Sequence, residues 1–437
     1  FTSIEDLHCF VYGLNIASIY AIVNGLGKRI VFPEFITFSA ITLWLTVPLL
    51  IYDLHLEHFA IPNLFGSEIL AIKKTEYYKW ALPATLAMTL GLNLNSFKVS
   101  RIKTQFLDLE PYLSQVNREL PKILFGIGAL ALLIGKYLPG SLGFVFFLLS
   151  QLTFIAVLYC IYGNFSYSKW IYWGAAVISL QGVAAGGMFG ELVWWGLIIV
   201  IYALIKLQWS FVKKFALITL GVFLINTLQV VKGEYRRLTW SNNSGEKAGL
   251  VLLGKTVWKA TFDHQGSNTN AGAFFLMYRM NQAYTVSRVM KHVPKKEPYA
   301  QGETVVGSLF ASFVPRLLWP TKPISGGHDN MERFANFNPH GGASYDIGQI
   351  GDAWANFGYY GGIFFLFIYG FFNSWLLKYF INFSAKVFPT LILWIPIVFL
   401  QLLKVEVSVV TNFNAAIKGA FFILIIFWLS RKLKFQL

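Results

Sequence analysis

The sequence has few charged residues and few cysteines. Only 13% of its 437 residues are charged, whereas 56% are hydrophobic, and a globular protein carries charge on roughly a quarter of its residues. A chain this apolar needs lipid around it, so most soluble classes are excluded. The 76 aromatic residues also exclude a disordered or collagen-like chain. Although the net charge is +15, no Lys/Arg-rich tail or stripe exists, which argues against a nucleic-acid partner.

Several catalytic and metal-binding motifs are missing as well. The two cysteines, Cys9 and Cys160, lie in apolar stretches, so no disulfide framework is indicated. No HExxH, CxxC or paired Cys/His spacing suggests a metal site. Without a DxD element or a Walker loop, sugar nucleotides and ATP are not expected as substrates, and without GxSxG neither is serine hydrolysis. We expect no metal and no cofactor.

Long apolar runs are the dominant feature of the sequence. A transmembrane helix needs about 20 predominantly apolar residues. The sequence predicts an all-α polytopic membrane protein with about 11 to 12 transmembrane helices. The eleven candidates lie at 8–23, 31–52, 79–97, 122–137, 141–162, 168–187, 190–206, 211–231, 359–377, 385–403 and 414–431.

The distribution of Lys and Arg predicts the orientation of these spans. With the C-terminus in the cytoplasm, the cytoplasmic loops collect sixteen Lys/Arg, against six in the short external loops and span ends. Cytoplasmic loops are the ones enriched in these residues. We therefore expect three parts: an N-terminal bundle of about eight spans (1–231), an extracytoplasmic segment with short helices (232–357), and three C-terminal spans (358–437).

The segment 232–357 is the expected functional part, because a connection of this length is usually functional or disordered and its aromatic residues argue against disorder. It holds fourteen Lys/Arg and nine Asp/Glu. Its stretch 271–292 predicts a helix closed by Pro294, and 304–319 predicts a short interfacial or re-entrant piece broken at Pro315. The stretch 304–319 is apolar but too short to span the membrane.

Cationic residues recur just before the ninth span. Arginine matches phosphate oxygens with a planar fork, so we read Arg279, Arg288, Arg316, Lys322 and Arg333 as a clamp for a lipid diphosphate. The alternative is that each lies at the membrane interface and pairs with a nearby acid such as Glu303, Glu332 or Asp329. In a continuous helix Arg279 and Arg288 would face opposite sides. We expect Arg279, among Phe and Met residues, to be semi-buried and Arg288 to be solvated.

Candidate acids and bases follow in the same segment. They are Asp352, His340, Asp346 and His328, of which Asp352 lies in a glycine-rich approach to the ninth span. A carboxylate can accept the proton of an attacking hydroxyl, but Asp352 could equally cap a helix. The aromatic residues that could stack on sugar rings are Tyr278, Tyr284, Trp319, Tyr345 and Trp354, and an interfacial aromatic belt is the alternative for all of them.

Three elements together resemble the Wzy-type polymerases of oligosaccharide repeat units, which act in O-antigen and exopolysaccharide assembly. The elements are Arg279-Met280-Asn281, PRLLWPTKP at 315–323 and GDAWANFG at 351–358. Asp352 stands where glutamate is commoner in that family.

The resemblance implies a GT-C-like glycosyltransferase of the bacterial inner membrane that works without a metal. It would transfer glycan from an undecaprenyl-diphosphate-linked donor to the non-reducing end of a lipid-linked repeat unit, with inversion. The implied roles are diphosphate binding for Arg279, Arg288, Arg316, Lys322 and Arg333, catalysis for Asp352, His340 and Arg316, and glycan contacts for Tyr278, Trp319, Tyr345 and Trp354.

The implied partners are the lipid-linked donor and acceptor, the bilayer, and a chain-length regulator and flippase of the same pathway. Two other functions stay open at this point. An O-antigen ligase uses the same donor with lipid A core as acceptor, and a lipid-linked oligosaccharide flippase also needs many spans and cationic contacts.

Overall fold

The computed structural model describes residues 4–56, 69–95, 106, 109–114, 116–135, 137–138, 140–186, 189–240, 249–262, 277, 279–313, 327–338 and 346–432. Within these ranges every regular element is a helix and none is a strand. The predicted all-α class is therefore confirmed for this part of the chain. The predicted spans overlap helical elements, although 385–403 is divided among Gly348–Val387, Pro389–Leu393 and Ile395–Leu402. Of the eleven to twelve spans predicted, six helices in the described part are long and apolar enough, by length and composition, to cross a membrane.

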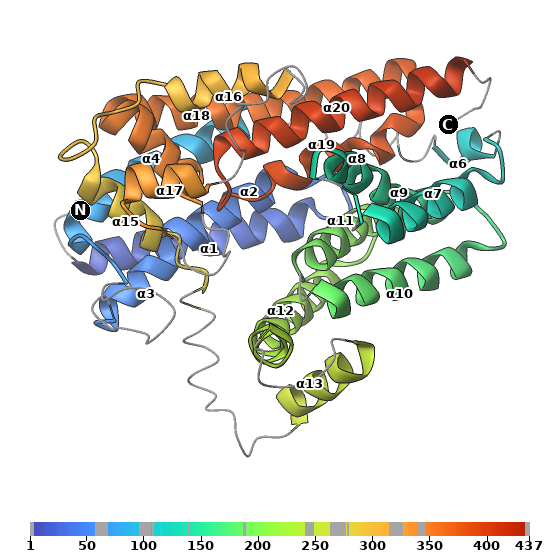
Figure 1. The fold of residues 1–437 in the computed structure, drawn as a ribbon, viewed down its shortest axis with the longest axis horizontal. Helices are drawn as coiled ribbons and strands as arrows, with labels where there is room; N and C mark the ends of the chain where they lie inside the picture. Colours follow the sequence, from blue (N-terminus) through green and yellow to red (C-terminus); the bar gives the residue numbers. More distant parts are fainter. Residues whose placement is uncertain are drawn as a thin grey trace.

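The N-terminal helices form one side of the molecule (Figure 1), and α4 among them packs against the long helix α18. The turn η1 is π-helical and joins α2 to α3 without interruption, so that 32–53 is one apolar segment. These elements are α1 (Ile4–Gly25), α2 (Phe32–Ile41), η1 (Thr42–Thr46), α3 (Val47–Asp53) and α4 (Lys74–Leu94).

The middle of the chain forms a second group of helices on the opposite side (Figure 1). Here α8 and α9 together make one apolar segment, Leu142–Tyr162. The elements are α6 (Leu109–Leu113), α7 (Leu120–Gly135), α8 (Gly140–Ser150), α9 (Leu152–Tyr162), α10 (Ser168–Gly186), α11 (Gly190–Leu207), α12 (Phe211–Trp240) and α13 (Leu250–Phe262).

The described part of the C-terminal third contains five short elements before and between two long helices. The short helices α15, α16 and α17 all lie in the predicted extracytoplasmic segment, which was expected to contain short helices. The elements are α15 (Ala283–His292), α16 (Glu303–Phe313), α17 (His328–Ala335), α18 (Gly348–Val387), the 3-10 turn η2 (Pro389–Leu393), α19 (Ile395–Leu402) and α20 (Val409–Lys432).

Helix α18 is packed closely on α4 through glycines. A Cβ atom added at Gly91 would collide with the backbone of Phe367, and one at Gly370 would collide with the backbone of Met88. Small residues let two membrane helices approach until their backbones touch. The two glycines therefore set the distance between the N-terminal helices and the C-terminal third.

Gly358 divides α18 into two parts. Its φ of 65° and ψ of −156° are not helical, and a positive φ of this kind is accessible mainly to glycine. The ring of Tyr299 lies 2.9 Å from the position of a Cβ at Gly358. The kink falls where the sequence predicted the ninth span to begin, so 348–357 belongs with the preceding segment and 359–387 forms the long apolar helix.

The described part of 283–357 has a small core of its own. Buried side chains from α15, α17 and the first part of α18 pack together: Val289, Val293, Ala300, Met331, Phe334, Ala335, Ile347 and Ala355. Helix α15 ends two residues before Pro294, as predicted. Its predicted start was wrong, because the helix is broken at Met280–Gln282 and resumes at Ala283. The side chain of Gln282 holds this turn by donating to the carbonyl of Asp346.

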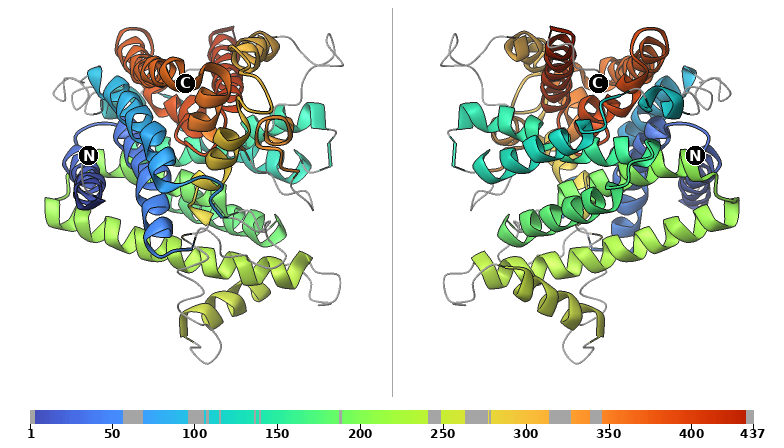
Figure 2. Two further views of the ribbon diagram at one scale, coloured as in Figure 1. Left: turned by 90° about the vertical axis from the view of Figure 1, so that its left-hand side faces the viewer. Right: turned by 90° about the vertical axis from the view of Figure 1, so that its right-hand side faces the viewer.

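Helix α12 crosses the direction of the other long helices. Figure 1 shows it end-on where α18 and α20 run lengthwise, and Figure 2 shows it lengthwise. It continues to Trp240, past the predicted end of its span at 231, and it is not among the six helices that meet the length and composition of a span. Its last turns accordingly extend from the apolar run into the polar segment that follows.

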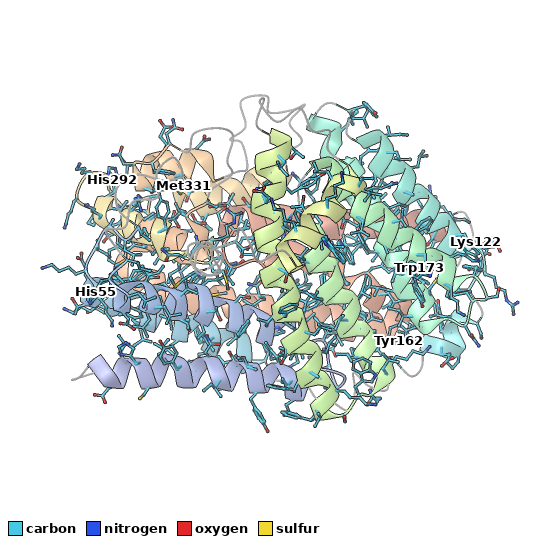
Figure 3. All side chains as sticks on the ribbon, turned by 90° about the horizontal axis from the view of Figure 1, so that it is seen from below. His55, Lys122, Tyr162, Trp173, His292 and Met331 are labelled. Carbon is cyan, nitrogen blue, oxygen red and sulfur yellow. The ribbon has the colours of Figure 1, made fainter. Side chains whose placement is uncertain are left out.

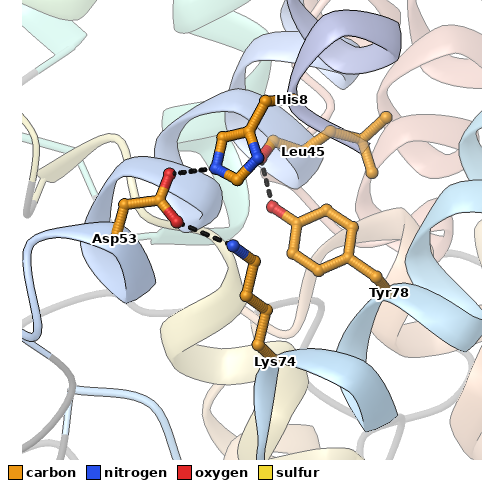
Figure 4. A network of polar contacts seen from close by, with 5 residues as sticks. All are labelled: His8, Leu45, Asp53, Lys74 and Tyr78. Atoms are coloured by element: carbon orange, nitrogen blue, oxygen red, sulfur yellow. Dashed lines mark hydrogen bonds and ion pairs between the residues drawn. The ribbon is translucent and has the colours of Figure 1, made fainter. Parts of the chain in front are cut away.

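Figure 3 shows the two ends of the molecule. His55, His292 and Met331 lie at one end, whereas Lys122 and Tyr162 lie at the other. A polar network at the first end ties three helices together (Figure 4): Asp53 of α3 accepts from Lys74 of α4 at 2.7 Å and lies 2.6 Å from His8 of α1.

Candidate functional site

Three helix N-termini meet at one place in the fold. The backbone amide of Gln349, in the first turn of α18, lies 3.4 Å from the carbonyl of Val405, just before α20. Gln282, which precedes α15, bonds the carbonyl of Asp346 at 3.3 Å. Gly348 has a positive φ, and a Cβ there would lie 2.6 Å from the Gln282 amide nitrogen. Helix N-termini carry partial positive charge, so this convergence favours negative groups.

Two carboxylates occupy this place. Asp346 Oδ2 accepts from the backbone N–H of Ser408 at 2.9 Å, and Asp352 Oδ2 accepts from that of Val409 at 2.8 Å. Val409 is the first residue of α20, so Asp352 of α18 caps a different helix. The sequence left capping and catalysis open for Asp352, and the geometry gives it the capping contact. Asp346 lies two residues before α18 and close enough to Asp352 for the two carboxylates to interact.

The second oxygen of each carboxylate has no partner. Asp346 Oδ1 and Asp352 Oδ1 are both buried and make no hydrogen bond among the residues that the structure describes. The whole of Asp352 is 0% exposed. A buried ionised carboxylate is costly unless it is fully bonded, and desolvation raises the pKa of Asp346 although the Ser408 amide and hydroxyl and the Gly348 and Ile347 amides oppose this. The pair is therefore suited to hold a proton.

Buried amide side chains around the pair are also incompletely bonded. Both polar atoms of Asn281, the Oε1 of Gln349 and the Oδ1 of Asn412 lack partners within the described ranges. Buried polar groups are usually hydrogen-bonded, so such a concentration needs an explanation. These atoms come from the three segments that meet at the helix N-termini. They offer donors and acceptors to a polar ligand or to water.

A group of cations adjoins the carboxylates. Lys232 and Arg236 are four residues apart on one face of α12, and Arg279 raises the positive potential at both. Burial, with repulsion from Arg279 and Arg236, lowers the pKa of Lys232 to about 8. Burial raises the pKa of Glu406, which Arg279 and Lys404 oppose. Arg279 thus acts on Glu406, which lies two residues before Ser408 in the stretch whose amides bond the carboxylate pair.

Arg279 and Arg288 are placed differently from the sequence prediction. Arg279 is exposed, and Arg288 is half-buried. The Arg288 guanidinium donates to the Tyr284 carbonyl at 2.9 Å and lies 3.8 Å from the centre of the Tyr284 ring. The expectation of a semi-buried Arg279 and a solvated Arg288 was wrong, because the break at Met280–Gln282 separates Arg279 from the helix that packs Arg288.

Two other predicted site residues have structural contacts. Arg333 bonds Glu297 at 2.6 Å and Glu303 at 3.5 Å, which is the acid pairing considered as an alternative. The indole nitrogen of Trp354 donates to the Val293 carbonyl at 3.0 Å. Its ring lies edge-on to Trp80 with centroids 5.1 Å apart. Arg333 thus joins α17 to Glu297 and to α16. Trp354 joins α18 to the residue after α15 and to α4.

Six of the predicted residues lie outside the described residues: Tyr278, Arg316, Trp319, Lys322, His340 and Tyr345. The structure adds Lys232 and Arg236 to the candidate site. In the sequence they were counted only among the Lys/Arg residues of 232–357. Their spacing of four at the end of an apolar run was the available signal. Among the described residues, no group of three His, Cys, Asp or Glu side chains could hold a metal ion.

Comparison with known proteins identifies a family for which no activity is described. No curated protein and no solved structure matches the chain. The matched region, residues 116–435, is well over half of the chain and contains α7 to α20, with both the carboxylate pair and the cations. It matches a family described only as a domain of unknown function, DUF8712, and the chain belongs to that family.

Proposed function

We propose that the protein is a membrane glycosyltransferase that polymerises lipid-linked oligosaccharide repeat units. The observation that carries the proposal is the group of Lys232, Arg236 and Arg279, of which Arg279 acts on Glu406, together with the buried carboxylate pair that bonds Ser408 and Val409 a few residues further along. Transfer from a diphosphate donor needs both features: cations for the charge that develops on the leaving group and a base for the acceptor hydroxyl. The resemblance of 279–281, 315–323 and 351–358 to Wzy-type polymerases supports the same activity.

The reaction assigns a role to each group. The acceptor hydroxyl attacks the anomeric carbon of the donor glycan as the bond from that carbon to the diphosphate oxygen breaks. The cations Arg279, Lys232 and Arg236, with Arg316 and Lys322, stabilise the undecaprenyl diphosphate that leaves. The hydroxyl proton passes to Asp346 and Asp352 or to His340. Attack on the face opposite the leaving group inverts the anomeric carbon.

The paired carboxylates suit a shared proton better than two separate charges. Like charges in one buried site raise the pKa of one partner, and a base near neutrality is the most effective. Arg333 and Trp354, which were predicted to bind diphosphate and glycan, become supporting residues in this proposal, because their polar atoms are already bonded.

A deletion experiment in the source bacterium tests the proposal. Deletion of the gene should remove long glycan chains while single repeat units still reach their final acceptor. If polymer accumulates on the carrier lipid and none reaches the lipid core, the protein is a ligase instead. If lipid-linked units stay on the cytoplasmic face, it is a flippase. Complementation by the wild-type gene should restore the full range of chain lengths.

A further inference from the structure

An apolar groove runs between α9, α10 and α11, away from the site described above. Its volume is about 590 Å³, and its walls are almost entirely hydrocarbon, with Phe154, Val157, Ala176, Ile199 and Ala203 among them. Gly196 also lines it, is exposed, and has nothing within 4 Å of an added Cβ. The groove is therefore open to the surroundings of the helices and unfilled by the protein's own side chains.

The groove is longer than one leaflet is deep. Its lining on α11 extends from Leu192 to Leu207, which corresponds to about 22 Å along a helix. One leaflet of a bilayer contributes about 15 Å of hydrocarbon. An acyl chain that enters from one leaflet can thus lie along most of the groove from its end at Leu207. α11 and the α8–α9 segment are both among the six candidate membrane helices.

One end of the groove is polar. Lys206 and Tyr172 line it there, together with Ile161, whose carbonyl accepts from the Lys206 ammonium at 2.7 Å. That bond uses one of the three ammonium protons. Phe154 and Trp195, stacked with centroids 4.7 Å apart, lie at the other end. The groove therefore combines an apolar slot with a cation at one mouth only.

The surroundings of Lys206 have the character of a membrane interface. Lys213 is exposed, and the Lys214 ammonium lies 3.3 Å from the position of a Cβ at Gly27, next to Lys28. Trp209 and Phe211 are exposed in the same short stretch, 36% and 52% respectively. Aromatic residues mark membrane interfaces, and basic pockets between membrane helices on the cytoplasmic side bind anionic headgroups. The charge count predicts this end to be cytoplasmic.

We propose that the groove binds one acyl chain of an anionic phospholipid from the cytoplasmic leaflet, with its phosphate held by Lys206. The charge at the polar mouth selects the headgroup, and the slot along α11 selects a straight hydrocarbon chain. The polyprenyl substrate is excluded as the occupant by position. Glu191, at the opposite end of α11, interacts electrostatically with Lys404 near the candidate site, so a diphosphate at that site lies at the far end of the helix.

Two pairs of variants test the site. Gly196→Leu fills the slot without a clash, and Gly182→Leu is its control, because Gly182 is exposed on α10, lies outside the groove and also has nothing near an added Cβ. Lys206→Gln removes the headgroup charge, and Lys386→Gln, exposed at the end of α18, is the matched control. All four proteins should unfold within a few degrees of the wild type in detergent without added lipid.

The full-length protein in detergent is titrated with phosphatidylglycerol and, separately, with phosphatidylcholine of identical chains, and bound lipid is counted by native mass spectrometry. We expect one tightly bound phosphatidylglycerol in the wild type and both controls. Lys206→Gln should weaken it about fivefold, since one cation near a membrane surface contributes on the order of 1 kcal/mol, and Gly196→Leu should abolish it.

Three outcomes overturn the proposal. Equal affinity for the two lipids shows that Lys206 selects no headgroup. Unchanged binding in Gly196→Leu shows that the chain lies elsewhere. Recovery of a polyprenyl phosphate with the wild type and Gly182→Leu, but not with Gly196→Leu, shows that the groove holds the carrier lipid. None of these results depends on whether the protein polymerises glycan.

Discussion

The carboxylate of Asp352 accepts a hydrogen bond from the backbone N–H of Val409 at 2.8 Å, so a residue of α18 caps the N-terminus of α20. The same carboxylate leaves its second oxygen buried and unpaired. One side chain therefore joins two C-terminal helices and presents a proton acceptor. These two roles can be separated by mutation.

Asp352→Asn should keep the helix cap and lose the acceptor. The amide oxygen still accepts from Val409, so the melting temperature should stay close to that of the wild type while chain extension disappears. Asp352→Ala removes the cap as well, and loss of a cap costs about 1 kcal/mol, so its melting temperature should fall. Thermal unfolding and a glycan gel measure the two effects. Near-normal chain length in Asp352→Asn would remove Asp352 from the mechanism.

Asp346 should make stability depend on pH. Its pKa is raised by burial above the usual value of 3.8, so the folded protein holds the proton more tightly than the unfolded chain does. The resulting stabilisation is complete below the unfolded pKa and is lost as pH rises through the folded pKa. Asp346→Asn should flatten this part of the profile. Melting temperatures between pH 4 and pH 8 give the comparison, and an equally steep profile in the variant would contradict it.

Lys232 should make diphosphate binding depend on pH in the alkaline range. Because its pKa is lowered to about 8, it loses its charge as pH rises through that value. Affinity for undecaprenyl diphosphate should then fall by about tenfold, as expected for one hydrogen bond to a charged group. Lys232→Arg should hold its affinity up to pH 9.5, and Lys232→Gln should bind weakly at every pH. The same fall in Lys232→Arg would exclude Lys232 as its source.

The contact between α4 and α18 should tolerate no side chain at its glycines. Gly370→Leu drives a side chain against the backbone of Met88, and overpacking of this kind costs about 1–3 kcal/mol. The melting temperature should drop, whereas Gly182→Leu, with open space around its Cβ, should not lower it. Equal melting temperatures for the two variants would show that α4 and α18 can separate without cost.

Apolar length and glycine position were readable from the sequence. Runs of about 20 apolar residues located a helix in all eleven places, and Gly358 forms a kink at the predicted start of the ninth span. Both follow from local chemistry, since the bilayer requires helices and a positive φ requires glycine. Pro294 likewise ended α15 where expected.

Contacts between distant segments were not readable. The pairing of Asp346 with Ser408 spans 62 residues and that of Arg333 with Glu297 spans 36, and no sequence periodicity reports such distances. Lys232 and Arg236 were overlooked because α12 continues to Trp240 and carries them toward Arg279. The break at Met280–Gln282 reversed the expected burial of Arg279 and Arg288 because tertiary contacts of Gln282 outweigh the local preference for helix.

In the proposed mechanism the cations Lys232, Arg236 and Arg279 serve glycan transfer from a lipid diphosphate. The most direct measurement is chain extension by the purified protein in liposomes supplied with undecaprenyl-diphosphate-linked repeat units, followed by gel analysis of the glycan and assay of released undecaprenyl diphosphate. The wild type should give a ladder of repeat multiples with one released carrier per added unit, and Arg279→Gln should give neither, while Lys386→Gln matches the wild type. A wild-type protein that releases no carrier and builds no ladder would contradict the account.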